Sequence, residues 1–362
     1  MTRDPRAGFV LAVTLWFLAA VAVGAGFFSY WTEGLLREAR ESLGDLDGDI
    51  NESSTLATLY FLLTTEPIKQ RGIVLSSTDE DLTTTPVIED EAMFAEERTP
   101  DRKTKTNKAV ILLDDQPYLG IGTARFSIQD ESGLLDINNL RKSNLKRLLV
   151  LLGVESGRTE ALIDKLEDYI DADDKHRLNG AESSHYQELG LSPPANRRLF
   201  TSWEARNILD WGGQASLWVD NRLPRTTSVH GALPNFNYAP SLALQTFSGI
   251  DADTASKIIA ARRIKPFNTA QEAYTAAERV FRVMEMEMAF YPTAYQRVTL
   301  WNDRGRRMRE LHLELQYMNQ NATAPLSIDY EIVLSLSEEL QREELQPVQH
   351  YLFKPSVSAR SK

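Results

Sequence analysis

The sequence has 362 residues, 42% of them hydrophobic, so it can bury a core and has room for two or three domains. Its formal net charge of −11 disfavours nucleic acid as a partner, because an acidic chain is repelled by phosphate backbones. It contains no cysteine, which excludes disulfides, cysteine–zinc sites and thiol nucleophiles.

An uncharged segment near the N-terminus predicts a membrane-spanning helix. Residues 7–32 carry no charge, and the strongly apolar part, residues 8–28, is 21 residues long. At about 1.5 Å per residue this part measures roughly 31 Å, close to the thickness of the hydrocarbon core of a bilayer. Arg3 and Arg6 precede it, and six acidic residues follow it by position 49. Since cationic flanks stay in the cytoplasm, we expect the N-terminus inside and the rest of the chain outside.

The apolar segment allows three interpretations. It is a removable secretory signal with a cleavage site near Ala20–Ala22, an uncleaved anchor, or a prepilin-type leader that ends at Gly8 and is cleaved before Phe9. Helix-compatible sequence continues past the membrane, and its apolar face is made by Leu35, Leu36, Ala39 and Leu43. A helix that lies half in the membrane and half on a globular domain is the pilin design, so this continuation favours the third interpretation.

The next part of the chain is loop-like and then strand-like. Residues 44–55 predict a hinge or loop, residues 55–64 a short buried helix, and the polar stretch 76–108 a long exposed loop. Apolar runs over 109–114 and 118–130 predict two strands that turn at Gln116–Pro117.

A large helical block follows, between Asn139 and about Ala289. Apolar residues recur there at helical spacing, and capping boxes at Thr201 and Thr269 each predict the start of a helix. After Pro292 the pattern returns to strands, over 296–301, 310–316 and 328–336. The order of long helix, strands, helices and strands predicts an α+β domain with an all-helical domain inserted into it.

This organisation divides the chain into six parts. They are a leader (1–8), an N-terminal helix (9–43, spanning the membrane over 9–30), a first α+β part (44–138), an inserted helical domain (139–291), returning strands (292–355) and a polar tail (356–362).

The helical block contains a helix-hairpin-helix pattern around Gly249, where the hairpin needs permissive dihedral angles. A looser copy covers residues 148–166. Such hairpins either bind phosphate through their amides or serve as compact packing modules. Asp251 stands where a DNA-binding hairpin usually has a second glycine, and its carboxylate repels phosphate, so we favour packing.

An acidic cluster lies inside the same block. Asp171, Asp173 and Glu182 occupy positions 1, 3 and 12 of a twelve-residue window, as in an EF-hand loop. His176 stands where an EF-hand has glycine, so the loop is not an EF-hand. It is either a calcium loop of another shape or the solvated end of an acidic helix.

The residues that carry enzyme chemistry form no pattern in this sequence. The five histidines fit no metal or triad motif, and the Gly120–Gly122 pair lacks the third glycine of a dinucleotide site. We therefore expect a protein that is not an enzyme.

Two stretches resemble a known family. The segment Phe126–Asn138 is similar to the D-E-S-G-x-(I/L)-(N/D)-(L/I)-N stretch of the general secretion pathway protein K (GspK) family. The segment Asp168–Asp173, with Gly180–Glu182 and Tyr186, resembles its D-(W/Y)-(I/V)-D-x-D … G-A-E-x-x-Y signature, although the tyrosine falls one residue later here.

The resemblance implies a minor pseudopilin of a bacterial type II secretion system. It implies cleavage between Gly8 and Phe9 by prepilin peptidase, N-methylation, a single span in the inner membrane and a periplasmic globular part. It implies a pilin-type fold whose helical insertion contains SAM-like, hairpin-type modules. It also implies calcium binding, which would use the cluster of Asp171, Asp173 and Glu182.

The partners implied by the resemblance are other secretion components. They are the I- and J-type minor pseudopilins at the pseudopilus tip, the major pseudopilin, the inner-membrane assembly platform, and the secretin or an exoprotein cargo. After cleavage the fifth residue would be Val13, where most pilins carry a glutamate that pairs with a neighbouring N-terminus. A subunit without that carboxylate suits a position with no pilin above it. Two alternatives stay open: a minor pilin of a type IV pilus or competence system, and a membrane-tethered hairpin protein that binds DNA.

Overall fold

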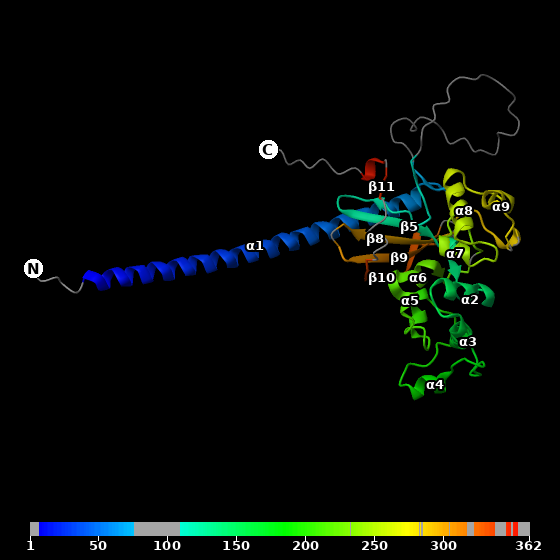
Figure 1. Cartoon of the computed structure of the whole chain (residues 1–362). Coiled ribbons are helices and arrows are strands. Elements are labelled where there is room, and N and C mark those ends of the chain that lie inside the picture. The colour runs from blue at the N-terminus through cyan, green and yellow to red at the C-terminus, as the bar shows by residue number, and fades with distance from the viewer. Residues whose placement is uncertain are drawn as a thin grey trace, which may run out of the picture.

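The computed structural model describes residues 7–75, 109–316 and 322–353, apart from residues 232, 282, 284, 304, 337–344 and 349. Within them the chain mixes helices with mainly antiparallel strands and begins with a long apolar helix, so the predicted α+β class is confirmed. The loop predicted at 76–108 and the tail at 356–362 lie outside the described residues. Figure 1 shows the first helix projecting from the part that holds the sheet and the other helices.

Helix α1, Ala7–Thr65, is 59 residues long and measures about 88 Å at ~1.5 Å per residue. The prediction that it ends at residue 43 is wrong, because the expected hinge and the expected short helix continue it without a break. Gly48, one source of that prediction, is buried where α1 meets the end of the sheet. A Cβ there would lie 3.1 Å from the side-chain nitrogen of Asn302. Packing on the sheet thus outweighs the low helix propensity of glycine.

A six-stranded sheet packs against the C-terminal part of α1, in the order β10-β9-β8-β5-β4-β11. All neighbours are antiparallel except β11 and β4. The strands are β4 Tyr118–Leu119, β5 Ala124–Asp130, β8 Tyr295–Asn302, β9 Arg307–Leu315, β10 Leu326–Ser335 and β11 Gln346–Pro347. The three returning strands are confirmed. The strand predicted over 118–130 is two strands, because Gly122 turns the chain there with a φ of 59°.

Two smaller sheets complete the strands. One has the order β1-β2-β3, with β1 Ile68–Lys69, β2 Gly72–Val74 and β3 Val110–Ile111. In the other, β6 (Leu135–Asp136) pairs in parallel with β7 (Thr227–Ser228). This second pair joins the chain that enters the helical block to a segment deep inside the block.

The helical block consists of short helices. The α-helices are α2 Lys142–Leu151, α3 Thr159–Ile170, α4 Ser183–Glu188, α5 Ala215–Trp218, α6 Arg222–Thr226, α7 Ser241–Gln245, α8 Ala252–Ile264 and α9 Ala270–Ala277. Within the described residues the 3-10 helices are η3 Glu131–Gly133, η4 Ser156–Arg158, η5 Ser202–Asn207, η6 Val219–Asn221, η7 Glu285–Glu287 and η8 Tyr351–Phe353. Thr201 and Thr269 begin η5 and α9 as predicted, each accepting a hydrogen bond from an amide three residues on.

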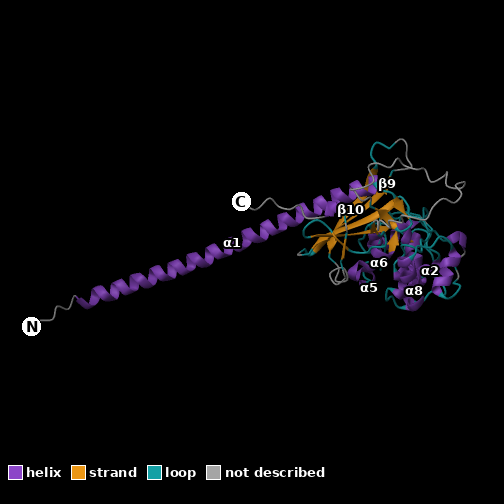
Figure 2. Cartoon of the chain, turned by 90° about the horizontal axis from the view of Figure 1, so that it is seen from above, coloured by secondary structure: helices purple, strands orange, loops and turns teal. Residues whose placement is uncertain are grey.

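Besides a small cluster of Trp301 and Met308, two large hydrophobic cores hold the described part of the chain. One fills the helical block around Trp211, Tyr186 and Phe236. The other lies between α1 and the sheet, where Leu59 and Leu62 meet Phe126. Figures 1 and 2 agree that α1 covers one side of the sheet and that α5 and α6 lie on the other side. The helical block is therefore carried on the sheet, away from the free end of α1.

Candidate functional site

The N-terminal part of α1 has the length and composition of a membrane span. It contains an 18-residue window with a mean hydropathy of 2.2, none of it buried, and it is the one such helix among the described residues. Gly8 and Phe9, the predicted processing site, lie in its first turns. Val13 is half exposed on the same segment.

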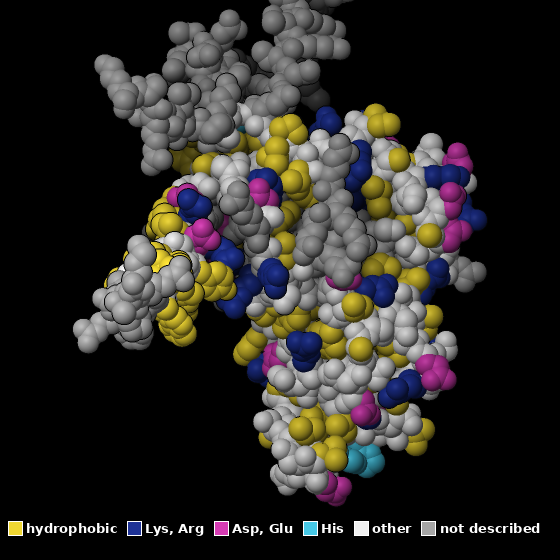
Figure 3. All heavy atoms as spheres, turned by 60° about the vertical axis from the view of Figure 1, so that its left-hand side comes forward, with side chains coloured by type: hydrophobic (Ala, Val, Ile, Leu, Met, Phe, Trp, Pro, Cys, Tyr) yellow, Lys and Arg dark blue, Asp and Glu magenta, His cyan; other side chains and the backbone are white. Residues whose placement is uncertain are grey.

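Beyond the span, α1 carries an apolar stripe that nothing in the described chain covers. Leu36, Leu43, Leu46 and Ile50 are each more than half exposed and, with Ala39, repeat at alternating spacings of three and four residues. This is the 3.5-residue period of a seam between two helices. The stripe lies opposite the face that packs on the sheet through Thr55, Leu59 and Leu62. Figure 3 shows hydrophobic side chains along the helix where it projects toward the viewer.

The D-E-S-G segment lies where the sheet leads into the helical block, and we call Asp130–Gly133 the insertion junction. Asp130 is fully buried and accepts hydrogen bonds from the Ser132 amide (2.9 Å), the Thr293 amide (2.7 Å) and Gln296 Nε2 (2.7 Å). Since Thr293 follows the exit of the block, Asp130 ties its entry to its exit. Burial raises the pKa of this carboxyl to about 6, against the hydrogen bonds that favour its charged form.

Glu131, the next residue, joins three parts of the chain. One carboxylate oxygen lies 2.5 Å from His312 Nδ1 on β9, and the other accepts a hydrogen bond from the Ser228 hydroxyl on β7 at 2.5 Å. Burial opposes ionisation, yet the His312 hydrogen bond and the nearby charges of His312 and His230 lower the pKa of Glu131 to about 2. The two adjacent carboxyls therefore shift in opposite directions.

Gly133 lies so close to neighbouring atoms in the insertion junction that a side chain would not fit there. A Cβ at this position would lie 2.6 Å from the backbone carbon of Tyr238 and 2.7 Å from Gln129 Nε2. The signature residues Asp130, Glu131 and Gly133 thus have one structural role, which is to lock the helical block onto the sheet.

The acidic cluster has a different membership from the one its spacing predicted. Ligand atoms of Asp168, Asp171 and Glu182 all lie within 4.8 Å of one another. Asp173 is exposed and outside this group, because its carboxylate accepts the Lys175 amide at 2.9 Å in a local turn. The structure therefore brings together two of the three predicted residues and adds Asp168, from the last turn of α3. We call residues 167–182 the acidic loop.

The acidic loop closes around Asp168. The Arg177 guanidinium contacts both Asp168 and Asp171, and the Arg177 amide donates to Asp168 Oδ2 at 3.0 Å. Gly180 leaves the space that this carboxylate fills, since a Cβ there would lie 1.8 Å from Asp168 Oδ2. The glycine of the G-A-E motif is thus required by the cluster.

Glu182 is the residue in the acidic loop that the described chain leaves unsatisfied. Both of its carboxylate oxygens are buried without a hydrogen-bond partner there, and so is Asp171 Oδ1. Burial, followed by the charges of Asp168 and Asp171, raises the pKa of Glu182 to about 7. Buried carboxylate oxygens that lack donors are the ligands that calcium takes, so the donor set fits this cation.

The hairpin around Gly249 has the predicted left-handed glycine, with a φ of 95° between α7 and α8. Asp251 caps α8 by accepting the Thr254 amide at 2.8 Å. Its carboxylate thus lies at the helix N-terminus, where a phosphate would otherwise bind. Ile250 and Ile258 are fully buried, so the hairpin contributes to the core of the helical block.

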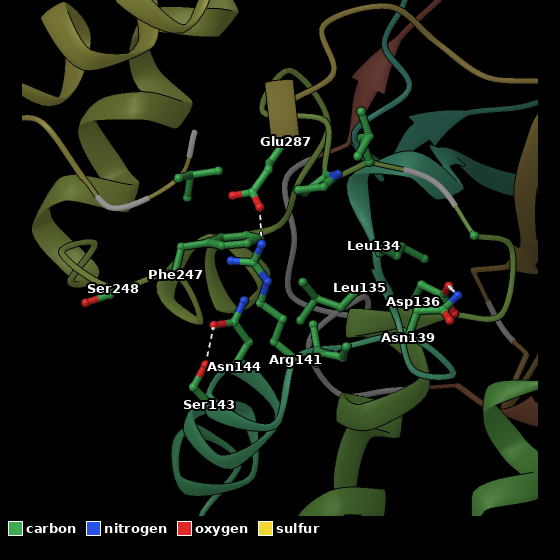
Figure 4. A pocket seen from close by; sticks show the side chains of 15 residues that line it. Leu134, Leu135, Asp136, Asn139, Arg141, Ser143, Asn144, Phe247, Ser248 and Glu287 are labelled. Carbon is green, nitrogen blue, oxygen red and sulfur yellow. Dashed lines mark hydrogen bonds and ion pairs between the residues drawn. The ribbon is translucent and has the colours of Figure 1, made fainter. Parts of the chain in front are cut away.

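A cavity of about 520 Å³ lies beside the insertion junction, between α2 and the residues that follow α9. Figure 4 shows Leu134 and Leu135 along one side, and an ion pair between Arg141 and Glu287 across it. The sequence did not predict this cavity, because its walls come from segments more than 140 residues apart.

Comparison with known proteins gives one consistent result. Residues 127–215 match the family model described as Type II secretion system (T2SS), protein K, which is a structural component of secretion machinery. That region contains both the insertion junction and the acidic loop. A putative type II secretion system protein K from Escherichia coli (strain K12) is 31% identical over 102 residues, covering 24% of this chain. The match spans about a third (31%) of that relative's length.

One solved structure is also similar. A chain of the GspK-GspI-GspJ complex from the enterotoxigenic Escherichia coli type 2 secretion system aligns with a TM-score of 0.42 and 13% identity. The alignment covers 59% of this chain and 80% of that one.

Proposed function

Because residues 127–215 match the family model of type II secretion system protein K, we propose that the chain is a minor pseudopilin anchored in the bacterial inner membrane. In this proposal it lies at the tip of the pseudopilus with I- and J-type minor pseudopilins and starts the fibre that exports proteins across the outer membrane. The globular part is periplasmic and the N-terminus faces the cytoplasm.

The observation that carries this proposal is the division of α1 into two exposed apolar surfaces. The first is long enough to span a bilayer, and the second is the stripe from Leu36 to Ile50, which is wide enough for one partner helix. A partner that also emerges from the membrane meets this stripe in parallel. Pseudopilin helices have that geometry, so the stripe supports assembly through α1.

The position at the tip is supported by two features. Val13 offers no carboxylate to a subunit above it, so the chain pairs poorly with a further pilin N-terminus. The helical block is attached to the sheet away from the free end of α1, where it obstructs the addition of another subunit (Figure 1). New subunits then add from the membrane side, where the assembly platform and the major pseudopilin lie, and raise this chain toward the secretin and its cargo.

Processing by prepilin peptidase is the first test. We expect the protein isolated from membranes to begin at N-methylated Phe9 when the peptidase is present and at Met1 when it is absent, measured by intact mass and N-terminal sequencing. A mature N-terminus after Ala22, or an N-terminus that is the same with and without the peptidase, would contradict the proposal. The chain would then be a secreted protein or a protein with an ordinary membrane anchor.

A charged substitution in the apolar stripe of α1 tests whether the chain assembles through that stripe. Leu43→Glu places a carboxylate in the seam and should lower cross-linking to the I-type pseudopilin at least tenfold. The control is Leu178→Glu, since Leu178 is 94% exposed in the acidic loop. That loop joins α3 to α4, which lie away from α1 in Figure 1. Equal cross-linking by both variants would exclude the stripe as the assembly surface.

The acidic loop is proposed as a calcium site of this pseudopilin. Asp168, Asp171 and Glu182 would hold the ion, which would supply the positive charge that Glu182 lacks. The hairpins of the block are proposed to be SAM-like packing modules, as Asp251 at the start of α8 supports. Bound calcium would keep the acidic loop closed when the tip meets its partners.

A further inference from the structure

A second cluster of ionisable side chains lies at the insertion junction. It contains two imidazoles, His312 on β9 and His230 next to β7 in the helical block, on either side of the Glu131 carboxylate. We call these three residues with Asp329 of β10 the junction cluster. Its members come from the sheet and from the helical block, so it crosses the boundary between the two parts.

The distances place each imidazole beside acceptors. His312 Nδ1 lies 2.5 Å from Glu131, and its Nε2 lies 3.9 Å from Glu310. His230 Nε2 lies 3.6 Å from Glu131 and 3.4 Å from Asp329. Both Nε2 atoms are buried and have no hydrogen-bond partner among the described residues. A proton on His312 Nε2 would point toward a carboxylate.

Ring stacking also favours the protonated, positively charged form of His312. His312 stacks on Tyr330 with centroids 3.9 Å apart, and His230 stacks on Tyr295 at 4.1 Å. An aromatic face attracts a cation that lies over it, so Tyr330 stabilises the imidazolium form of His312.

The charges around the cluster are mainly negative. The ionisable groups that face the two imidazoles are Glu131 from η3, Tyr295 and Arg297 from β8, Glu310 and Glu314 from β9, and Asp329 and Tyr330 from β10. Arg297, the permanent cation in this set, already pairs with Asp115 at 3.0 Å. Glu131, Glu310 and Asp329 each lie within 4 Å of a histidine ring nitrogen and therefore depend on the histidines for positive charge.

We propose that protonation of His312 controls how firmly the helical block is held on the sheet, so that the insertion junction is a pH-sensitive joint. When His312 is charged, Glu131 is held by an ion pair from the sheet and keeps its hydrogen bond from Ser228 of the block. When His312 loses its proton, Glu131 keeps its negative charge in a buried site with less compensation. The segment Thr227–His230 then opens more often, because the contact of Ser228 with His312 of the sheet through Glu131 has weakened.

The direction of the pH response follows from the two partners. Burial lowers the pKa of His312, but the hydrogen bond with Glu131 and the charges of Glu131 and Glu310 outweigh it and raise the pKa above its usual value. Its stabilising effect is therefore complete below the ordinary histidine pKa of about 6.5 and is lost as the pH rises through the folded-state pKa. Glu131, with a pKa of about 2, stays charged throughout that range. The joint is tightest in mildly acidic solution and loosens on the alkaline side.

Hydrogen–deuterium exchange of the full-length chain in detergent micelles tests the joint. After correction for the intrinsic rate, we expect exchange at Thr227–His230 to accelerate at least fivefold between pH 6 and pH 9, while the buried centre of β8 changes less than twofold. In His312→Gln the segment should exchange fast at both values. The control is His176→Gln, which alters an exposed histidine of the acidic loop and should keep the wild-type response.

A second variant keeps the test decisive if His312→Gln does not fold. Asp329→Asn removes one negative charge at the partly exposed rim of the cluster and leaves the His312–Glu131 pair in place. It should shift the midpoint of the exchange transition to lower pH, because a proton is held less strongly without that charge. An unchanged midpoint in Asp329→Asn, or an equal acceleration with pH in His312→Gln and wild type, would overturn the proposal.

Discussion

The insertion junction and the acidic loop bury the same kind of group in opposite ways. At the junction, Asp130 and Glu131 each receive donors from residues about 100 to 180 positions away, among them Thr293, Ser228 and His312. In the acidic loop, the donors that the described residues offer to Asp168 and Asp171 come from Arg177, and no described donor lies within hydrogen-bond distance of the Glu182 carboxylate. The number of hydrogen-bond donors thus distinguishes the two regions: the buried carboxylates of the insertion junction are satisfied by the protein, whereas those of the acidic loop still need a cation.

The largest expected effect comes from removing the charge at the junction. Glu131→Gln should lower the free energy of unfolding by about 3 kcal/mol, because the buried charge that pairs with His312 is lost while the imidazole remains. Urea unfolding of the full-length chain in micelles at pH 6, followed by tryptophan fluorescence, measures this change.

The matched control for the junction is Glu160→Gln, since Glu160 pairs with Lys146 at an exposed position and should contribute little. If both variants lost the same stability, the junction would be no stronger than a surface pair, and its contrast with the acidic loop would disappear.

The next effect in size concerns the glycine of the acidic loop. Gly180→Ala should destabilise the chain by about 2 kcal/mol, because the added methyl group collides with the Asp168 carboxylate and backbone movement is needed to relieve it. Gly157→Ala is the control, because nothing lies within 4 Å of a Cβ at that position. Thermal unfolding of both variants in chelator gives the comparison, and equal midpoints would show that Asp168 does not fill this space.

Local patterns in the sequence predicted much of this fold. The uncharged apolar run gave the membrane-spanning part of α1, the threonine caps gave the starts of η5 and α9, and the strand-like runs after Pro292 gave β8, β9 and β10. The expected hinge over 44–55 was wrong because glycine there serves packing on the sheet, and such contacts are invisible to local propensity.

The sites were harder to predict than the fold. The 1, 3, 12 spacing selected Asp173 and passed over Asp168, because an EF-hand template assumes one continuous loop, whereas this cluster begins on the last turn of α3. Pairing of Glu131 with His312 could not be predicted, since it depends on β8 pairing with β5 on one side and with β9 on the other. The D-E-S-G motif was visible as a signature, but its role required the tertiary structure.

A smaller and opposite effect is expected at Glu182. Without metal, Glu182→Gln should raise the free energy of unfolding by about 1 kcal/mol, because it removes a buried carboxylate whose oxygens lack donors. The same variant should lose the stabilisation that millimolar calcium gives the wild type. Thermal unfolding with calcium and with chelator measures both changes. Loss of stability in chelator would mean that Glu182 has donors and that the acidic loop resembles the junction.

The smallest effect is expected at Asp173, and it decides which residues form the calcium site. Asp173→Asn keeps an oxygen that can accept the Lys175 amide, so stability in chelator should not change measurably. The shift of the unfolding midpoint on adding calcium should also stay within 1 °C of wild type, whereas Asp168→Asn should abolish it. If instead Asp173→Asn abolished the response and Asp168→Asn preserved it, the ligands would follow the sequence spacing, and Asp168 with Arg177 would be a structural pair like Glu131 with His312.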